Sequence, residues 1–199
     1  MSKILKTSYF LIGFTILFSI IFQIFYFIAE NNFELVNFFS LFTIQSNLLA
    51  SIVLIVASNK SNQTIDYLRG LATLTVMIAG LGFFLLLGGV QDYLLITVNL
   101  ILHYLSPIAL LVMWLINPPS AEMPIKRTLS WLIYPFVYFI YSIIRGEIIN
   151  WYAYDFFNPS ISGVSGVITN FLIILIGSLA IIWFLSITKK KIKKTAPKD

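Results

Sequence analysis

The sequence predicts an all-α integral membrane protein, a bundle of six transmembrane helices with both termini in the cytoplasm. Of its 199 residues, 59% are hydrophobic and only 11% are charged, whereas about 25% of a soluble domain is charged. The apolar residues form six runs, each close to the roughly 20 residues that cross a bilayer. The basic residues fall in alternate loops. This length leaves no room for a second soluble domain, so we expect residues 1–199 to form one domain.

The six apolar runs are bounded by Asn, Gly, Pro and charged residues. The first follows Lys3 and Lys6, which look like the start of a signal peptide. About 20 apolar residues follow without a small-x-small cleavage site, so we expect this segment to remain as a membrane anchor. The expected spans cover residues 8–29, 37–57, 70–90, 93–116, 129–146 and 165–187.

Lys and Arg residues predict the orientation, because short cytoplasmic loops are enriched in them. Of the 13 basic residues, all except Arg145 lie before span one, after span six, or in the loops that follow spans two and four. Both termini are therefore expected in the cytoplasm. The basic tail of about residues 188–199 is expected to act as a topology signal that contacts anionic headgroups, not nucleic acid.

Composition excludes several kinds of chemistry. The chain has no Cys, which removes disulfides, thiol nucleophiles, Fe–S clusters and Cys-type zinc sites. With one His and eight scattered carboxylates, we expect no metal site and no cofactor. The abundance of Ile, Phe, Asn and Lys is typical of an AT-rich bacterial source, and we therefore expect a multi-pass protein of the bacterial cytoplasmic membrane.

Polar side chains inside the spans are the first candidates for function, because they are costly in hydrocarbon. Span one contains Gln23, about 9 Å from its outer end at the helical rise per residue. Span two contains Gln45 and Ser46, together with four polar residues whose spacing of i, i+3, i+7 and i+11 places them on one helical face. Those four are Ser40, Thr43, Asn47 and Ser51.

Spans four and five carry polar stripes of their own. The stripe of span four has the spacing i, i+4, i+7 and consists of Asn99, His103 and Ser106. The stripe of span five has the spacing i, i+4, i+7, i+11 and consists of Tyr134, Tyr138, Tyr141 and Arg145. Pro107 and Pro135 lie in the same two spans, and each removes a backbone donor, so kinks there can open a cavity.

These residues have both structural and functional interpretations. Most Ser and Thr side chains are expected to bond neighbouring helices, whereas Gln45 and Asn47 fit packing and a pocket equally well. His103 is the single His, and the neutral-range pKa of His makes it the natural base or proton carrier. The tyrosines form a packing face or donate to a pocket, and Arg145 is placed to hold an anionic headgroup or a fatty carboxylate.

Three segments, taken together, resemble a known family. They are FTIQSN (residues 42–47), HYLSP (103–107), and LSWLIYPFVYFIYSIIRG followed by WYAYDFFNP. In order and spacing they resemble a family of bacterial six-span membrane proteins of unassigned function, over nearly the whole chain. That family is distantly similar to the androgen-induced membrane hydrolases, which cleave fatty acid esters of hydroxy fatty acids. The resemblance implies Thr43 as nucleophile and His103 as its partner.

Depth along the spans points to a second nucleophile. Counted from the expected span ends, Thr43 lies about 9 Å deep and His103 about 16 Å deep. A nucleophile and its base must approach to about 3 Å. Ser46 is nearer in depth to His103 and is the reserve nucleophile, and Asn47 is expected to orient the imidazole.

We therefore expect an outward-opening polar pocket between spans one, two, four and five. The first hypothesis is an intramembrane hydrolase of fatty acyl esters, with Thr43 attacking and His103 as base. The alternatives are a lipid or small-molecule binding protein or transporter with the same pocket, and an interaction protein whose stripes only hold helices together. Expected partners are membrane lipids and a lipid-like ligand, and the oligomeric state stays open. The residues expected to bind substrate or the oxyanion are Gln23, Gln45, Ser46, Asn47, Asn99, Tyr138, Tyr141 and Arg145.

Overall fold

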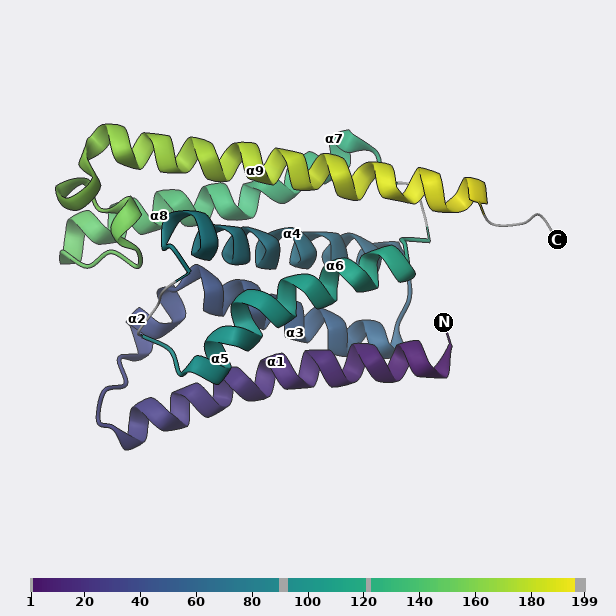
Figure 1. Cartoon of the computed structure of the whole chain (residues 1–199), viewed down its shortest axis with the longest axis horizontal. Coiled ribbons are helices and arrows are strands. Elements are labelled where there is room, and N and C mark those ends of the chain that lie inside the picture. Colours follow the sequence, from purple (N-terminus) through teal and green to yellow (C-terminus); the bar gives the residue numbers. More distant parts are fainter. Residues whose placement is uncertain (1, 90–92, 121–122, 196–199) are drawn as a thin grey trace.

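The structure is a computed structural model that describes residues 2–89, 93–120 and 123–195, with side chains described as far as residue 187. Within these residues, six helices are long and apolar enough to cross a membrane. They lie side by side in an elongated bundle, and the chain enters the first and leaves the last at the same end (Figure 1). The predictions of an all-α chain and of six helices able to span a membrane are thereby confirmed for the described residues.

The six spans consist of simple and composite helices. Three spans are each one continuous helix, namely α1 (Lys3–Ala29), α3 (Phe42–Asn59) and α4 (Gln63–Leu86). The fourth span joins α5 (Ile96–Leu100), η1 (Ile101–Leu105) and α6 (Ser106–Ile116). The fifth span joins α7 (Ile125–Thr128), η2 (Leu129–Leu132) and α8 (Ile133–Ile149). The sixth is α9 (Pro159–Thr195), and two short elements, α2 (Leu35–Ser40) and η3 (Asp155–Phe157), lie between spans.

The second span is broken near its start, where the sequence predicts a continuous helix from residue 37. Leu41 has an extended backbone (ψ 127°) between α2 and α3 and provides no side-chain cap. The first N–H groups of a helix lack intrahelical partners, and here two tyrosines supply them. The N–H of Phe42 donates to the Tyr138 hydroxyl and that of Thr43 to the Tyr154 hydroxyl, each at 3.2 Å. The break therefore places the start of α3 against two phenols.

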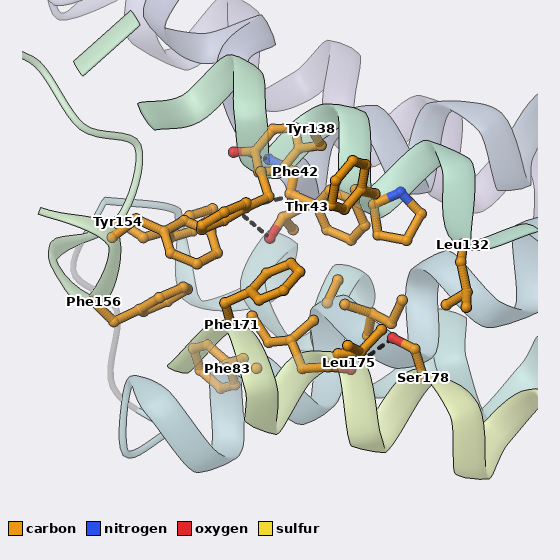
Figure 2. Close-up of a pocket in the computed structure, with 18 of the residues that line it drawn as sticks. Phe42, Thr43, Phe83, Leu132, Tyr138, Tyr154, Phe156, Phe171, Leu175 and Ser178 are labelled. Carbon is orange, nitrogen blue, oxygen red and sulfur yellow. Dashed lines mark hydrogen bonds between the residues drawn. The ribbon is translucent and has the colours of Figure 1, made fainter. Parts of the chain in front are cut away.

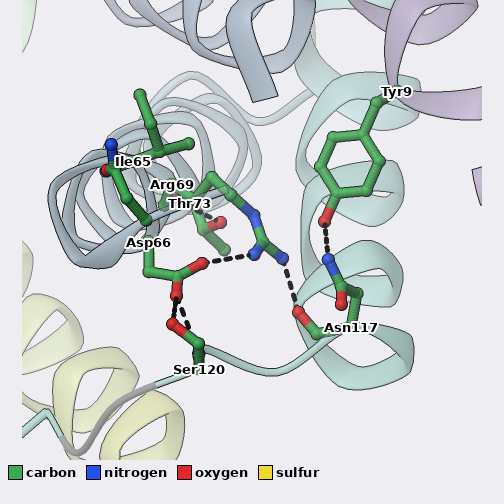
Figure 3. Close-up of polar contacts among 8 residues, drawn as sticks. Tyr9, Ile65, Asp66, Arg69, Thr73, Asn117 and Ser120 are labelled. Atoms are coloured by element: carbon green, nitrogen blue, oxygen red, sulfur yellow. Dashed lines mark hydrogen bonds and ion pairs between the residues drawn. The ribbon is translucent and has the colours of Figure 1, made fainter. Parts of the chain in front are cut away.

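The third span begins at Gln63, earlier than the predicted residue 70. Its N-terminus is capped by the Asn62 side chain, which accepts from the N–H of Ile65 at 2.9 Å. This start places Asp66 and Arg69 inside the helix, although the sequence pattern assigns them to a loop. Both are buried and form an ion pair at 2.9 Å (Figure 3).

The fourth span contains a π-helical turn, η1, which ends two residues before Pro107. Pro107 has no N–H for the carbonyl of His103 four residues earlier, and such losses distort the preceding turn. That carbonyl faces Gly80 of α4, where an added Cβ would lie 3.0 Å from it. The absent side chain at Gly80 thus lets α4 approach the turn that carries His103.

Two apolar clusters hold the bundle together. The first joins α1, α3, α4 and the fourth span, and the second joins α4, α8, α9 and the segment that links α8 to α9. Many large apolar side chains remain exposed on the outside, among them Phe14, Ile133 and Trp183. An apolar exterior of this extent fits a surface that contacts lipid.

Candidate active site

Three side chains from two spans form a continuous hydrogen-bonded chain. Thr43 is the second residue of α3, His103 lies in η1, and Asn99 lies one turn before it in α5. The Thr43 hydroxyl lies 3.1 Å from Nε2 of His103, and Nδ1 of His103 lies 2.5 Å from the side-chain oxygen of Asn99. Thr43 and His103 are each only 3% exposed. The contact between these two residues is the one that the family resemblance implies.

The partners of the imidazole determine its protonation. The oxygen of Asn99 can only accept, so Nδ1 of His103 carries the proton and Nε2 presents its lone pair. The Thr43 hydroxyl therefore donates to Nε2. The ring of Phe83 stacks on the imidazole, with centroids 4.2 Å apart and planes at 19°. The imidazole is thus held in the tautomer and orientation that a general base for Thr43 requires.

A third hydroxyl, that of Tyr154, reaches the same site from the segment between α8 and α9. It lies 3.2 Å from both the backbone nitrogen and the hydroxyl oxygen of Thr43. Since the Thr43 proton points to His103, the Tyr154 hydroxyl is the donor toward Thr43. Burial raises the pKa of Tyr154 above its ordinary value, so the phenol stays protonated at neutral pH.

A cavity of about 430 Å³ adjoins these groups. It lies between α3, α4, η1, α8 and α9, and it is lined mainly by aromatic and aliphatic side chains. Tyr154 and Phe156 lie at one end of it, and Leu132 and Ser178 lie at the other (Figure 2). Thr43 and His103 both contribute to its wall. The cavity therefore combines a long apolar space with reactive groups in its wall.

The cavity borders the outer surface of the bundle along the fifth span. Leu129, Ile133 and Phe136 line it, and the same three residues are exposed on the outside, Ile133 at 63%. An apolar wall of this kind faces lipid in a membrane protein.

The predicted polar pocket differs from this cavity in two ways. Span one is absent from its wall, and Gln23 instead accepts a hydrogen bond from the N–H of Leu95 at 2.9 Å. Asn47 and Asn99 also lie outside the lining. A shared helical face does not determine which neighbouring helix a side chain contacts. Gln23 and Asn47 bond backbone groups and Asn99 bonds His103, so none of the three lines the cavity.

Asn47 does not orient the imidazole, contrary to the prediction. Its amide nitrogen donates to the backbone oxygens of Thr43 at 2.9 Å and Leu102 at 3.1 Å. It thereby holds α3 against η1, and Asn99 takes the predicted orienting position. Ser46 bonds the backbone oxygen of Thr43 at 3.1 Å, so its hydroxyl points back along α3.

The remaining predicted residues join α8 to the region around α2. Tyr138 lines the cavity and donates to the backbone oxygen of Ser40 at 2.9 Å, and the Tyr141 and Ser40 hydroxyls lie 2.6 Å apart. Gln45 accepts from Tyr134 at 3.0 Å. Arg145 donates to Asn37 at 2.5 Å and lies over the Trp151 ring, 4.3 Å from its centroid.

No family model, curated protein or solved structure matches this chain. In the part of the chain that the structure describes, His, Asp and Glu side chains form no group of three or more that could hold a metal ion. The arrangement of Thr43, His103 and Asn99 is therefore the basis for a functional assignment.

Proposed function

We propose that this polytopic membrane protein is an intramembrane hydrolase of fatty acyl esters, with Thr43 as nucleophile and His103 as general base. The observation that supports it is the hydrogen-bonded order Thr43–His103–Asn99 beside an apolar cavity. A hydroxyl, a base within about 3 Å and a third group that orients the base are the shared parts of nucleophilic acyl-transfer sites. The resemblance to the androgen-induced hydrolases selects the same hydroxyl and the same His.

The proposed reaction has two steps. The Thr43 oxygen attacks the ester carbonyl carbon while its proton moves to Nε2 of His103, and the carbonyl electron pair moves to oxygen. Collapse of this intermediate breaks the ester C–O bond, and the departing alkoxide takes the proton from Nε2. Water, deprotonated by the same nitrogen, then attacks the acyl carbon. The bond between this carbon and the Thr43 oxygen breaks, Nε2 returns the proton to that oxygen, and the fatty acid is released. Asn99 keeps the proton on Nδ1 and stabilises the imidazolium that forms transiently.

The cavity supports an acyl chain as the group that binds. Its volume of about 430 Å³ falls within the roughly 300–1,000 Å³ of ligand sites, which are likewise mostly apolar. Its length runs from Tyr154 toward Ser178 between α8 and α9 (Figure 2). We infer that the acyl chain lies along these helices, with the ester at Thr43.

The orientation of the bundle belongs to the same proposal. The start of α3, which carries Thr43, and the segment between α8 and α9, which carries Tyr154, lie toward the end of the bundle opposite the two termini (Figure 1). With the termini in the cytoplasm of a bacterium, as the basic residues indicate, the site opens in the outer half of the cytoplasmic membrane.

Hydrolysis of a chromogenic fatty acyl ester by purified protein in lipid nanodiscs tests the function. Thr43→Ala and His103→Ala should each lower kcat about 10³-fold or more, as loss of a nucleophile or base does. Thr43→Ser should retain activity, because it keeps the hydroxyl. Ser46→Ala is the matched control and should match wild type, because the Ser46 hydroxyl bonds the backbone oxygen of Thr43 and Ser46 is not part of the cavity wall.

Equal activity of wild type, Thr43→Ala and His103→Ala would contradict the proposal. The alternative is a lipid-binding protein or transporter, in which the cavity holds a ligand without reaction. In that case wild type would not hydrolyse the ester, and His103→Ala would change the affinity for a fatty acid.

A further inference from the structure

The proposed reaction places negative charge on the carbonyl oxygen of the substrate, and this charge needs hydrogen-bond donors. Sequence analysis offers Gln23, Gln45 and Asn47 for this role. The structure does not place these amides at the cavity: Gln45 donates to the backbone oxygen of Phe39 at 2.8 Å, Asn47 bonds two backbone oxygens, and Gln23 lies outside the cavity wall. The donor must therefore come from another residue.

We infer that the Tyr154 hydroxyl, which accepts the backbone N–H of Thr43, is the donor that stabilises the oxyanion. This inference rests on the proposed function. Tyr154 lines the cavity and comes from the segment between spans five and six. It would thus be a catalytic residue supplied by a loop.

Geometry supports this assignment. The oxyanion forms two bonds away from the Thr43 hydroxyl oxygen, on the carbon that this oxygen attacks. Tyr154 places its hydroxyl 3.2 Å from that oxygen, and the same hydroxyl accepts the Thr43 N–H at 3.2 Å, so the phenol is held beside the attacking atom. Effective donors lie about 2.7–3.1 Å from the position of the oxyanion, a distance that a small shift of the phenol provides.

The proton inventory is consistent with a donor role. Before attack, the Tyr154 proton points to the Thr43 oxygen, because the Thr43 proton points to His103. As the Thr43 oxygen bonds to carbon, negative charge appears on the carbonyl oxygen, and the phenol proton turns toward it. Tyr154 keeps its proton throughout and leaves the proton transfers to His103. Its raised pKa, caused by burial, keeps the phenol neutral.

The segment around Tyr154 holds the phenol in place. The Tyr154 ring stacks on Phe156, with centroids 5.0 Å apart and planes at 8°. The backbone oxygen of Phe156 accepts a hydrogen bond from Asn170 of α9 at 3.0 Å, and Phe157 is buried in the second apolar cluster. Donors that are fixed before the reaction stabilise developing charge most effectively.

Tyr154→Phe, which removes only the hydroxyl, tests the inference in the ester assay. We expect kcat/KM to fall about 10²–10³-fold, as for the loss of one oxyanion donor, with KM little changed. Tyr152→Phe is the matched control, because Tyr152 bonds the exposed Glu147 side chain. Inhibition by an alkyl boronic acid, which forms a tetrahedral adduct with a hydroxyl, should weaken by the same factor, while inhibition by the fatty acid product should not.

A purely structural role for Tyr154 would weaken both inhibitors alike, and that result would overturn the inference. Wild-type activity of Tyr154→Phe together with an inactive Thr43→Ala would overturn it while leaving the proposed function intact. If Thr43→Ala is active, the function and the inference fail together.

A second variant keeps the test valid if Tyr154→Phe does not fold. 3,5-Difluorotyrosine at position 154 retains the ring and the hydroxyl but ionises at lower pH. Because an ionised phenol cannot donate, the alkaline limb of kcat/KM should move to lower pH, and an unmoved limb would overturn the inference.

Discussion

The side-chain oxygen of Asn99 lies 2.5 Å from Nδ1 of His103, one turn further along the fourth span. Because this oxygen accepts and cannot donate, it fixes the proton on Nδ1 and leaves the lone pair of Nε2 facing Thr43. A contact within one helix thus determines which imidazole nitrogen can act as a base.

Removal of this contact should impair catalysis more than folding. In Asn99→Ala the imidazole can adopt the other tautomer, and we expect kcat to fall about 10²–10⁴-fold, in the range seen when a base loses its orienting group. Asn99→Asp should retain much of the activity, because a carboxylate also accepts from Nδ1. Full activity of Asn99→Ala in the ester assay would show that the tautomer does not matter.

Gly146 of α8 allows the segment that carries Tyr154 to dock. A Cβ added at Gly146 would overlap the Tyr152 ring, so Gly146→Ala should displace this segment and destabilise the protein by about 1–3 kcal/mol, the usual range for overpacking. Gly177→Ala is the control, because nothing lies within 4 Å of its added Cβ.

Thermal unfolding in detergent and the ester assay together measure this effect. Gly146→Ala should melt at lower temperature and lose activity, and Gly177→Ala should do neither. Identical melting of the two variants would show that the ring of Tyr152 adapts without cost.

The sequence predicts part of the site because some of its contacts are local. Asn99 and His103 are four residues apart in one helix, and this spacing places them on one face wherever the helix packs. The apolar runs likewise predict all six spans, since their lengths match the bilayer. Contacts between spans depend on where each helix begins. The predicted starts at residues 37, 70 and 93 differ from the observed starts at Phe42, Gln63 and Ile96.

The depth of His103 illustrates the difference. Counted from Asp92, which lies outside the described residues, it is expected about 16 Å deep. The fourth span begins at Ile96, which places His103 about 10 Å along it. The second span begins at Phe42, which places Thr43 only about 1.5 Å along it. Residue counts from the span ends therefore do not give the relative depth of the two side chains, and their 3.1 Å contact removes the reason for Ser46 as reserve nucleophile.

Helical spacing could not identify Tyr154 as a site residue, because Tyr154 lies in a loop. Its segment, WYAYDFF, does carry a signal, since five of its seven residues are aromatic and loops are usually polar. An aromatic loop beside a polar stripe is a reason to place its side chains inside the bundle.

The ion pair of Asp66 and Arg69 should stabilise the end of the bundle that holds the termini. Asp66 accepts from the backbone nitrogen and the hydroxyl of Ser120, at 2.7 and 2.6 Å, and Arg69 donates to the backbone oxygen of Asn117 at 2.6 Å (Figure 3). Asp66→Asn leaves the buried guanidinium without its charge partner, which should cost about 3–5 kcal/mol.

Thermal unfolding of Asp66→Asn against a charge-free double variant, Asp66→Leu with Arg69→Met, separates charge from packing. The single variant should melt well below wild type and the double variant closer to it. A single variant as stable as wild type would show that Arg69 does not depend on this carboxylate.

The predicted orientation is open to direct labelling, because the chain contains no native Cys. Single cysteines at Asn32 and Ser160, both exposed residues at the end opposite the termini, should react with a membrane-impermeant maleimide in intact cells. A cysteine at Ser61, exposed at the other end, should react only after lysis. Labelling of position 61 in intact cells would contradict the predicted orientation and place the termini outside the cytoplasm.

The central claim is that the Thr43 hydroxyl is a nucleophile activated by His103. The most direct measurement is peptide mass spectrometry of the protein after treatment with a lipophilic fluorophosphonate or β-lactone. We expect one covalent adduct on the peptide that contains residues 42–47, assigned by fragmentation to Thr43, and we expect no adduct in Thr43→Ala or His103→Ala. An adduct on Ser46, or adduct formation that His103→Ala leaves unchanged, would contradict the claim.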